Sequence, residues 1–563
     1  MTKGLKMKKQ RNKSTIKQQF PINQVELCVA VIISLTAILL HIRFFISAGP
    51  LWRDEVNSFV LATSKSFSYI WQNLEFDSFP ILWHLVVRFW VFSGIGSSDN
   101  GIRLLGMITG IGFLLTSWWN AKRMFNTLPM ISLLLLGVST PVICYGDSLR
   151  GHGLGMVLGL ISFSLIWNVT ESPNPKRILI ALVAAILSTH MNFYNCIFLM
   201  AACFGGMVVS IKKHHWKNCC VILAIGFVTA CSMLIYFSMF ERANQWKMVH
   251  EYDASLSWII IKFFEGVGFS PGNKFEVFPT HWLWIALALI AIASSVASFK
   301  SQFRNKLSNR QRDVILFCVT ALLTGTVSYL IFFWFLRYYV QPWYFLIPMT
   351  LIGVCLDGII ISITMGSRKD RIIQLAIVCL MVGLSFKPVW FDTGLRKTNI
   401  DLAADHIQKY ASKRDIILIS PWYYSLTFRR YYHGDVDWTI IPPIDFTGLH
   451  RYDLIKDKMM SINAIEPIED KIKQTLRTGG RVWVVAEFNG CPNFPDNYPK
   501  PTALPAPDSP AKWNEGFYIN LWNVQICHYF HQHSTKVSIA SISPSMLISH
   551  YEIANVFVVE GWH

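Results

Sequence analysis

Residues 79–93 read Phe-Pro-Ile-Leu-Trp-His-Leu-Val-Val-Arg-Phe-Trp-Val-Phe-Ser, and their position relative to a membrane decides the fold. The stretch is strongly apolar, but it is shorter than the roughly 20 residues that a helix needs to cross a bilayer. It also carries His84 and Arg88, which are costly in the middle of a bilayer. Residues 79–93 are therefore either a short crossing or a helix along the membrane surface, and charges elsewhere in the chain distinguish the two.

Eleven other apolar runs are long enough to span a bilayer as helices. The composition agrees with them: 52% of the 563 residues are hydrophobic and 15% are charged, whereas a soluble domain carries roughly 25% charged residues. The sequence therefore predicts a polytopic α-helical membrane protein with about eleven transmembrane helices. The runs lie near residues 27–47, 101–121, 127–145, 153–169, 176–192, 194–211, 218–239, 281–299, 313–336, 340–364 and 371–387.

Basic residues decide the path of residues 79–93. Five clusters of Lys and Arg lie between the later apolar runs, and the N-terminal tail is basic too. Short basic loops stay in the cytoplasm. All five clusters fall on the same side as the tail only if residues 79–93 lie along the outer interface, so the charges favour an interfacial helix. The clusters are Lys122-Arg123, Lys176-Arg177, Lys212-Lys213-Lys217, Lys300-Arg304-Lys306-Arg310-Arg312 and Arg368-Lys369-Arg371.

This topology divides the chain into three parts. Residues 1–26 form a basic cytoplasmic tail, residues 27–387 form the transmembrane domain, and residues 388–563 form a domain outside the cytoplasm. In the last part, helical patterns alternate with short apolar stretches such as 415–420 and 481–486. Such alternation predicts a small α/β domain with a partly parallel sheet.

Three groups of polar residues lie in segments that this topology places at the outer surface of the membrane. Each group adjoins a spanning run, so the three can converge at one depth. Carboxylates and arginines at such a place suit a phosphate-bearing lipid headgroup and a proton acceptor. The groups are Arg53, Asp54 and Glu55 in the first outer loop (48–100); Tyr145, Asp147, Arg150 and His152 in the loop 145–152; and Arg337, Tyr338 and Tyr339.

Several of these residues also have an ordinary structural explanation. His84 suits a headgroup contact in an interfacial helix, and Arg88 and Arg103 could contact phosphate or extend from their helices to the interface. His190, in a later outer turn, either lines a pocket or caps its helix. Taken alone, Arg53-Asp54-Glu55 also fits a solvated helix end.

The order of these features resembles the GT-C superfamily of glycosyltransferases, which use polyprenyl-phosphate sugars as donors. The similarity is to the bacterial branch related to protein O-mannosyltransferases and lipid A aminoarabinose transferases, and it covers nearly the whole chain. A domain outside the cytoplasm after the last helix fits many members. The motifs are each short: Trp52-Arg53-Asp54-Glu55, Phe79-Pro80-Ile81-Leu82-Trp83-His84, Gly101-Ile102-Arg103-Leu104, the loop 145–150, Thr189-His190 and Arg337-Tyr338.

The resemblance implies transfer of a sugar from a polyprenyl-phosphate donor to a lipid, glycan or protein acceptor. The reaction would take place on the outer side of a bacterial inner membrane, with inversion at the anomeric carbon. Asp54, with Glu55 beside it, is the expected catalytic pair, and a partly desolvated pocket would raise the pKa of the Asp54 base. The expected substrate-binding residues are Arg53, His84, Asp147, Arg150, His190, Arg337 and Tyr338.

The second outer loop departs from the family pattern. Related enzymes often have an acidic residue three positions after the tyrosine, where this chain has Ser148 and carries Asp147 one position earlier. Arg150 does match, and would neutralise the donor phosphate. The sequence therefore leaves open whether the protein binds a divalent metal, Mg²⁺ or Mn²⁺, for which Asp54 and Asp147 would be the ligands.

Three further questions are left open by the sequence. Cys491 and Cys527 could form a disulfide in an oxidising compartment. Besides sugar transfer, the chain could be a transporter or flippase of lipid-linked sugars, or a non-catalytic membrane scaffold. Membrane lipids are expected partners, and nucleic acid is not, because the net charge of +17 lies in short loops rather than in a basic stripe.

Overall fold

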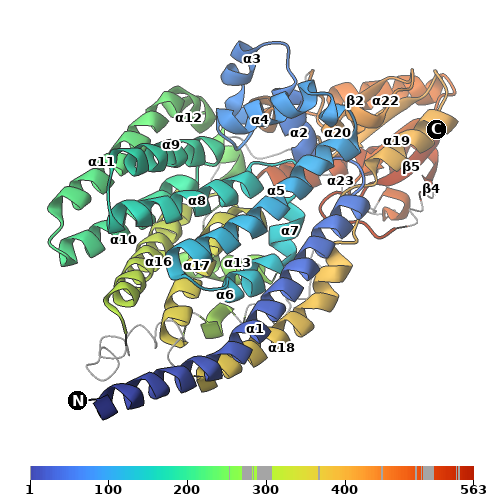
Figure 1. The fold of residues 1–563 in the computed structure, drawn as a ribbon. Helices are drawn as coiled ribbons and strands as arrows, with labels where there is room; N and C mark the ends of the chain where they lie inside the picture. Colours follow the sequence, from blue (N-terminus) through green and yellow to red (C-terminus); the bar gives the residue numbers. More distant parts are fainter. Residues whose placement is uncertain are drawn as a thin grey trace.

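The protein is a bundle of long helices with a smaller α/β domain at one end (Figure 1). The first outer loop lies at the same end of the bundle as this domain, and α1 starts at the opposite end (Figure 1). The computed structural model describes residues 2–252, 254–268, 307–364, 368–445, 448–488, 491–495, 513–540 and 546–563, together with residues 282, 284–287, 289, 498 and 542.

Within these described residues, eight helices are long and apolar enough to cross a membrane. They coincide with eight of the eleven predicted runs, which confirms the class of polytopic helical membrane protein. The spans are Gln24–Ser47 in α1 (Thr2–Ser47), Asp99–Phe125 from α5 (Asp99–Asn120), α8 (His152–Glu171), α10 (Asn195–Lys212), Trp216–Asn244 from α11 (Trp216–Ser232) to α12 (Phe237–Asn244), α16 (Asn309–Leu336), Pro342–Ile360 in α17 (Leu346–Thr364) and Arg371–Asp392 in α18 (Arg368–Asp392).

One of the other predicted runs forms a helix slightly too short to count among these eight, and another lies mostly outside the described residues. Residues 176–192 form α9 (Pro175–Met191), a helix of 17 residues that packs against α8. Residues 281–299 lie for the most part outside the described residues. Before α16 the chain also forms the short helix α13 (Leu256–Val267).

The run 127–145 is not one continuous helix. It is divided into α6 (Met130–Ser132), a π-helical turn at Leu133–Gly137, and α7 (Thr140–Gly146). Pro141 explains the break, because proline has no N–H group and its ring clashes with the carbonyl four residues earlier in a helix. The buried Asp357 of α17 accepts hydrogen bonds from free N–H groups at the start of α6.

The first outer loop folds into three short helices between α1 and α5. They are α2 (Arg53–Ala62), α3 (Phe67–Gln72) and α4 (Ile81–Phe92). The helix α4 contains the stretch that decides the topology, and with 12 residues it is too short to cross a bilayer. It begins directly after Pro80, which is tolerated at the start of a helix and not in its interior.

The C-terminal domain is an α/β domain with a mixed five-stranded sheet, as the alternating pattern predicts. The strand order is β2-β1-β3-β5-β4; β1 is parallel to β2 and β3, and β5 is antiparallel to β3 and β4. In chain order the elements are α19 (Ile400–Tyr410), β1 (Ile416–Ser420), α20 (Tyr424–Tyr431), β2 (Trp438–Ile440), α21 (Tyr452–Met459), α22 (Glu466–Arg477), β3 (Val482–Ala486), α23 (Glu515–His533), β4 (Ser534–Ala540) and β5 (Asn555–Trp562).

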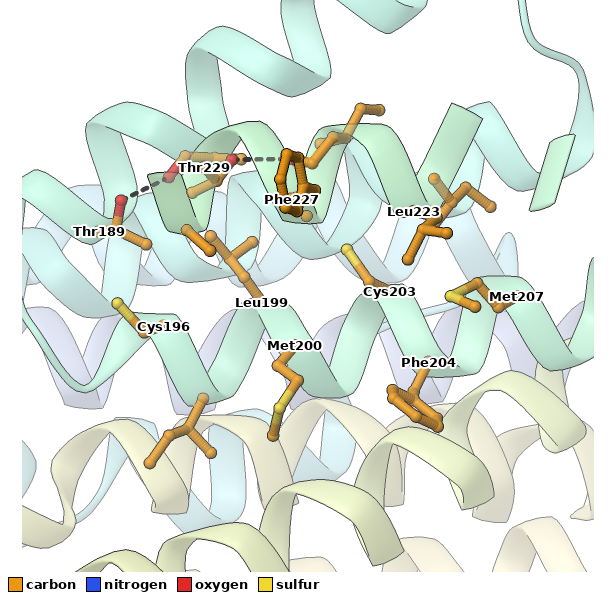
Figure 2. A pocket seen from close by; sticks show the side chains of 16 residues that line it. Thr189, Cys196, Leu199, Met200, Cys203, Phe204, Met207, Leu223, Phe227 and Thr229 are labelled. Atoms are coloured by element: carbon orange, nitrogen blue, oxygen red, sulfur yellow. Dashed lines mark hydrogen bonds between the residues drawn. The ribbon is translucent and has the colours of Figure 1, made fainter. Parts of the chain in front are cut away.

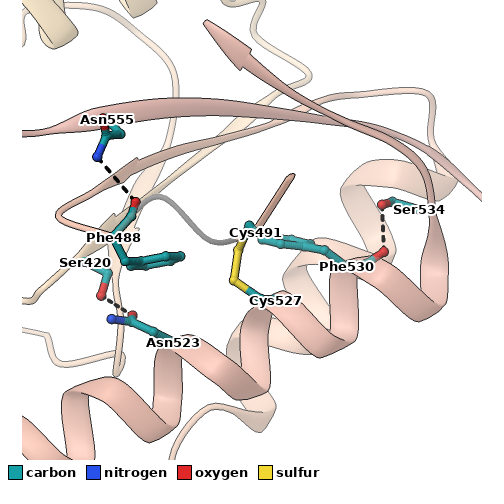
Figure 3. The surroundings of a disulfide bond; sticks show 8 residues. All are labelled: Ser420, Phe488, Cys491, Asn523, Cys527, Phe530, Ser534 and Asn555. Atoms are coloured by element: carbon teal, nitrogen blue, oxygen red, sulfur yellow. Dashed lines mark hydrogen bonds between the residues drawn. A yellow bond between two sulfur atoms is a disulfide. The ribbon is translucent and has the colours of Figure 1, made fainter. Parts of the chain in front are cut away.

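A disulfide joins Cys491 to Cys527 in this domain (Figure 3). It connects the segment after β3 to the middle of α23, beside Phe530. The pairing that the sequence left open is therefore present in the structure.

Direct contacts join the C-terminal domain to the first outer loop. The hydroxyl of Tyr431 in α20 accepts a hydrogen bond from the Leu51 N–H (2.8 Å), and Arg430 forms an ion pair with Asp99 (2.6 Å). Glu552 accepts a hydrogen bond from the Arg53 N–H at the start of α2 (2.9 Å). The domain is thus held directly over the expected catalytic residues.

Candidate active site

A cavity of about 500 Å³ lies where the first outer loop, the segment before α13, the segment after α16 and the C-terminal domain meet. Its wall combines a few charged groups with many aromatic rings, which is typical of sites that bind a small polar molecule. Asp54 lines it, and so do residues from four other regions of the chain. The lining residues that matter below are Arg53, Asp54, Glu75, Asp77, Arg150, Trp246, His250, Glu251, Tyr338, Trp343, Tyr344, Tyr423, His450, Tyr452 and Glu515.

Asp54 presents a free carboxylate to this cavity. It lies in the first turn of α2, with Arg53 Nε at 3.8 Å and His450 Nε2 at 4.0 Å from its Oδ1. Neither distance is a hydrogen bond, and no described residue donates one to this carboxylate. A substrate hydroxyl can therefore be its first hydrogen-bond donor.

The electrostatic surroundings of Asp54 differ from the expectation. Burial by itself raises the pKa of this carboxyl, but its interactions with Arg150, His450 and Arg53 outweigh burial and hold the pKa below its usual value. The predicted raised pKa is therefore wrong, because the prediction considered desolvation and not the neighbouring cations. Asp54 is ionised, and so able to accept a proton, throughout the neutral pH range.

Glu55 faces away from the cavity. Its carboxylate binds the Arg103 guanidinium through two hydrogen bonds of 2.7 and 2.9 Å, and it also accepts from the backbone N–H groups of Leu149 and Trp52. All of these groups are buried. The expected catalytic role of Glu55 has no support in this geometry, because both oxygens already hold the outer loop to α5 and to the loop before α8.

Arg150 lies beside Asp54, as its position in the second outer loop predicts. Its Nη1 donates to the Asp54 carbonyl (2.9 Å), to Asp77 Oδ1 (2.8 Å) and to Ser58 Oγ (3.2 Å), and the guanidinium lies over the ring of Phe79. A guanidinium has five N–H donors. Arg150 lines the cavity and is fixed through one nitrogen, and no described residue accepts a hydrogen bond from its other two nitrogens.

Two expected binding residues lie behind the cavity wall. Asp147 forms a buried hydrogen bond of 2.6 Å with His41 Nδ1 of α1 and does not line the cavity. His84 is fully buried behind Asp77, with its Nε2 3.8 Å from Asp77 Oδ2. Neither can contact a substrate in this arrangement.

His190 lies away from this cavity, at the end of α9. Its ring nitrogens contact the Tyr236 hydroxyl (2.9 Å) and Ser232 Oγ (3.1 Å). Tyr236 belongs to the same hydrophobic cluster as Phe76 and Trp246 of the cavity wall. His190 thus connects α9 to the end of α11 and the turn after it, and this contact is neither of the two roles, cavity lining or helix capping, that the sequence left open.

Arg337 and Tyr338 separate at the end of α16. Arg337 adopts a left-handed backbone conformation that ends the helix, and its side chain is 62% exposed, 3.7 Å from Glu251. It does not line the cavity. Tyr338 does line it, beside the ring of His250.

The C-terminal domain contributes residues that the sequence did not identify. Tyr423, His450, Tyr452 and Glu515 all line the cavity, although no motif marks them. The His450 N–H donates to Asn57 Oδ1 of α2 (3.0 Å), and this bond fixes the domain to the helix of Asp54. These residues meet Asp54 only through tertiary packing, so no local pattern could have predicted them.

The acidic residues of the cavity do not form a metal site. Asp147 is paired with His41 away from Asp54, and Asp77 is paired with Arg150. Among the described residues, no group of three or more His, Cys, Asp or Glu side chains could hold a metal ion. The metal site left open by the sequence, with Asp54 and Asp147 as ligands, does not fit this arrangement.

A second, apolar cavity lies between α10 and α11 (Figure 2). Its volume is about 420 Å³, and it is lined by the end of α9 together with side chains such as Met200 and Phe204 of α10 and Leu223 and Phe227 of α11. It contains no charged side chain. It suits a hydrocarbon chain and offers no group for chemistry.

Comparison with known proteins gives a likeness in fold alone. No protein-family model matches the chain, and no curated protein sequence is similar to it. Two crystal structures of ArnT from Cupriavidus metallidurans are similar in fold at 10% sequence identity. The apo structure has a TM-score of 0.49 and covers 95% of this chain and 98% of that one; the structure bound to undecaprenyl phosphate has a TM-score of 0.45 and covers 93% and 97%.

At these scores the likeness carries no functional argument by itself. The functional assignment depends on the cavity.

Proposed function

We propose that this protein is a membrane glycosyltransferase of the GT-C type, which transfers a sugar from a polyprenyl-phosphate donor to an acceptor. The observation that carries the proposal is a single cavity that joins the free carboxylate of Asp54 to the guanidinium of Arg150. A transfer reaction needs one group that accepts a proton and one that stabilises a leaving phosphate, and the cavity holds both.

The arginines suit the phosphate of the donor. Arg150 lines the cavity and has two nitrogens that no described residue engages, and Arg53, which also lines it, is held by the Tyr551 carbonyl and the ring of Tyr423. Burial by itself lowers the pKa of Arg53. The neighbouring Tyr423, Asp54 and Glu552 have a larger opposite effect, so the pKa is raised above its usual value and the guanidinium stays charged. Arginine binds phosphate through charge-assisted hydrogen bonds, which strengthen as negative charge develops on the leaving oxygen.

Asp54 is the proton acceptor in this proposal. The hydroxyl oxygen of the acceptor attacks the anomeric carbon of the donor sugar, and its proton moves to the Asp54 carboxylate. The bond between the anomeric carbon and the phosphate oxygen breaks, and its electron pair leaves with the polyprenyl phosphate. Attack from the side opposite the phosphate inverts the configuration of the sugar.

Aromatic residues form much of the remaining wall. Tyr338, Trp343 and Tyr344, all from the segment between α16 and α17, line the cavity together with Trp246 and Tyr452. Rings that carry a polar group offer an apolar face and a hydrogen-bonding edge to the same ligand. We infer that these residues contact sugar rings, although the same aromatic segment also suits a membrane-interface belt.

The location of the cavity suits a lipid-linked donor. The cavity wall includes Asp77 and Ser78, shortly before the apolar helix α4, and Tyr338, directly after the membrane-spanning helix α16. There a polar headgroup can enter the cavity while its chain stays in hydrocarbon. The positive-inside distribution of charge supports an extracytoplasmic location for this cavity. We propose a bacterial inner membrane, as the family resemblance implies.

The transporter alternative is less well supported. It expects ionisable groups that line a path near the middle of the bilayer. The ionisable His41 and Asp357 of the described spans are engaged in local contacts, with Asp147 and with the N–H groups of α6 respectively. The scaffold alternative leaves the free carboxylate of Asp54 unexplained.

Binding of the donor headgroup tests the proposal. Undecaprenyl phosphate is bound in one of the two ArnT structures of similar fold. It is a suitable probe for native mass spectrometry of the purified protein. Arg150→Gln should weaken binding about tenfold or more, the expected cost of losing a charge-assisted phosphate contact. Arg414→Gln, at an exposed position of the C-terminal domain, should leave binding unchanged. Wild-type protein that does not bind the probe would contradict the proposal.

A further inference from the structure

The cavity wall farther along the C-terminal domain differs in chemistry from the wall around Asp54. A chain of contacts connects the two: His450 faces Asp54, its Nδ1 contacts the Tyr452 hydroxyl (2.8 Å), and the Tyr452 ring packs against Trp422. The indole N–H of Trp422 then donates to Glu515 Oε1 (2.5 Å). Glu515 is therefore at the far end of one connected wall.

Glu515 has one oxygen available for a ligand. Its Oε1 is occupied by Trp422, whereas its Oε2 has His250 Nδ1 at 3.6 Å, which is too long for a hydrogen bond. Within the described part of the chain, no lysine or arginine forms an ion pair with this carboxyl. Burial raises the pKa of Glu515 to about 7, although the Trp422 hydrogen bond and Arg53 oppose the rise. The group can thus both donate and accept a hydrogen bond near neutral pH.

The basic side chains beside Glu75 and Glu251 are engaged by these carboxylates. Glu75 is bound by Arg242 through two hydrogen bonds (2.7 and 2.9 Å), and Arg337 lies 3.7 Å from Glu251. The neighbouring His250 has a pKa lowered to about 4, chiefly by burial, and is neutral at pH 7. The cation whose charge reaches Glu515 is Arg53, which is already engaged by the Tyr551 carbonyl and whose Nε lies 3.8 Å from Asp54 Oδ1. An anionic group placed at Glu515 would therefore meet the repulsion of Glu515 beside a cation that is already paired.

We propose that the wall formed by Glu515, Tyr452 and His250, with Trp422 buried behind it, is the acceptor subsite, and that it takes a neutral, hydroxyl-bearing sugar rather than a phosphate-bearing headgroup. The Glu515 carboxyl and the Tyr452 hydroxyl provide hydrogen bonds for sugar hydroxyls, and the aromatic rings provide an apolar face. The two ends of the cavity then divide the substrates by charge: the donor phosphate at Arg150 and the neutral acceptor at Glu515. This inference rests on the proposed function, since it assigns the second substrate of the same cavity.

A glycan array tests the proposal with the full-length protein in detergent. The array should carry neutral glycans together with the same glycans bearing a phosphate. Wild-type protein should bind neutral members, and prefer them over their phosphorylated partners by about tenfold, the size of a like-charge contact in a partly buried site. Glu515→Gln keeps the shape and removes the charge, so the preference should fall to less than about threefold.

The matched control is Glu466→Gln. Glu466 is the first residue of α22, as Glu515 is of α23, but it is exposed and remote from the cavity. This variant should keep the wild-type preference. The proposal is overturned if wild-type protein binds no neutral glycan, binds phosphorylated members equally well, or keeps its preference in Glu515→Gln.

Undecaprenyl phosphate binding by the same preparations separates this proposal from the previous one. Glu515→Gln should bind the lipid as wild-type protein does, which also shows that the variant is folded. Loss of lipid binding in wild-type protein with an intact glycan preference would contradict the donor assignment alone. Normal lipid binding without a preference for neutral glycans would contradict the acceptor subsite alone.

Discussion

Asp54 and Glu55 are adjacent in the sequence but lie in opposite environments. Successive residues of a helix point about 100° apart, so the first turn of α2 directs Asp54 into the cavity and Glu55 toward Arg103. The family resemblance pointed to Asp54 as the base and grouped Glu55 with it as catalytic, whereas the structure separates their environments. Their substitution should have different consequences.

Asp54→Asn should abolish sugar transfer, with a loss of about a hundredfold or more, because an amide cannot accept the acceptor proton. The variant should remain folded, since no described residue donates a hydrogen bond to this carboxylate. Transfer by purified protein in detergent, measured together with the melting temperature, checks both statements. Asp435→Asn, at an exposed ion pair with Lys413, is the control and should retain activity.

Glu55→Gln should affect stability instead of chemistry. It leaves the buried Arg103 guanidinium without its counterion, and breaking a buried pair in this way costs about 3–5 kcal/mol. The expected result is a lower melting temperature and a lower yield of folded protein. Normal stability combined with lost turnover would return Glu55 to the catalytic residues.

Helices show where sequence patterns were sufficient. The length of the run 79–93 and the placement of basic clusters indicated a short helix, and α4 has 12 residues. The run 127–145 has a suitable length and hydropathy, yet Pro141 divides it. Length and apolar character predict that a segment is buried in the membrane. Whether that segment forms one continuous helix depends on single residues and on tertiary partners such as Asp357.

The segment that carries His450 should respond to acid. Burial lowers the pKa of His450 to about 4, despite the opposing charge of Asp54. Its folded pKa lies below the unfolded value near 6.5, so its contribution to stability is present above pH 6.5 and is lost as the pH falls toward 4. The contribution is on the order of 3 kcal/mol.

The measurement compares melting temperatures of wild-type protein and His450→Gln between pH 7 and pH 4. The difference between wild-type protein and the variant isolates the effect of His450. The raised pKa of Glu515 stabilises the fold as the pH falls, and this effect is common to both proteins. Wild-type protein should lose more stability on acidification than the variant does. Equal losses of melting temperature in the two proteins would show that the fold does not lower the pKa of His450.

At the scale of the whole molecule, the cavity is built from parts more than 350 residues apart. Arg53, Asp54 and Arg150 were predicted from the outer loops, and the structure brings them together. The prediction that Arg337 lines the same cavity fails in the geometry, since its side chain is largely exposed. The C-terminal domain reaches the cavity because α20 packs against α2, and it contributes Tyr423, His450, Tyr452 and Glu515. Packing between two parts of a chain leaves no local pattern in the sequence of either part.

The disulfide should stabilise the C-terminal domain in its folded position. Closing a loop with a sequence separation of 36 residues is worth roughly 3–4 kcal/mol in the chain-entropy account. Replacing both Cys491 and Cys527 by serine should lower the melting temperature. A reductant should lower that of the wild type and leave the double variant unchanged. A wild-type melting temperature that ignores reductant would show that the bond contributes nothing.

We propose that the cavity at Asp54 transfers a sugar to an acceptor in the cell envelope. Mass spectrometry of envelope glycans tests it most directly, in cells that lack this protein and in the same cells supplied with wild-type protein or Asp54→Asn. One sugar should disappear without the protein, return with the wild type and stay absent with Asp54→Asn. An unchanged glycan composition in the deficient cells, or full restoration by Asp54→Asn, would contradict it.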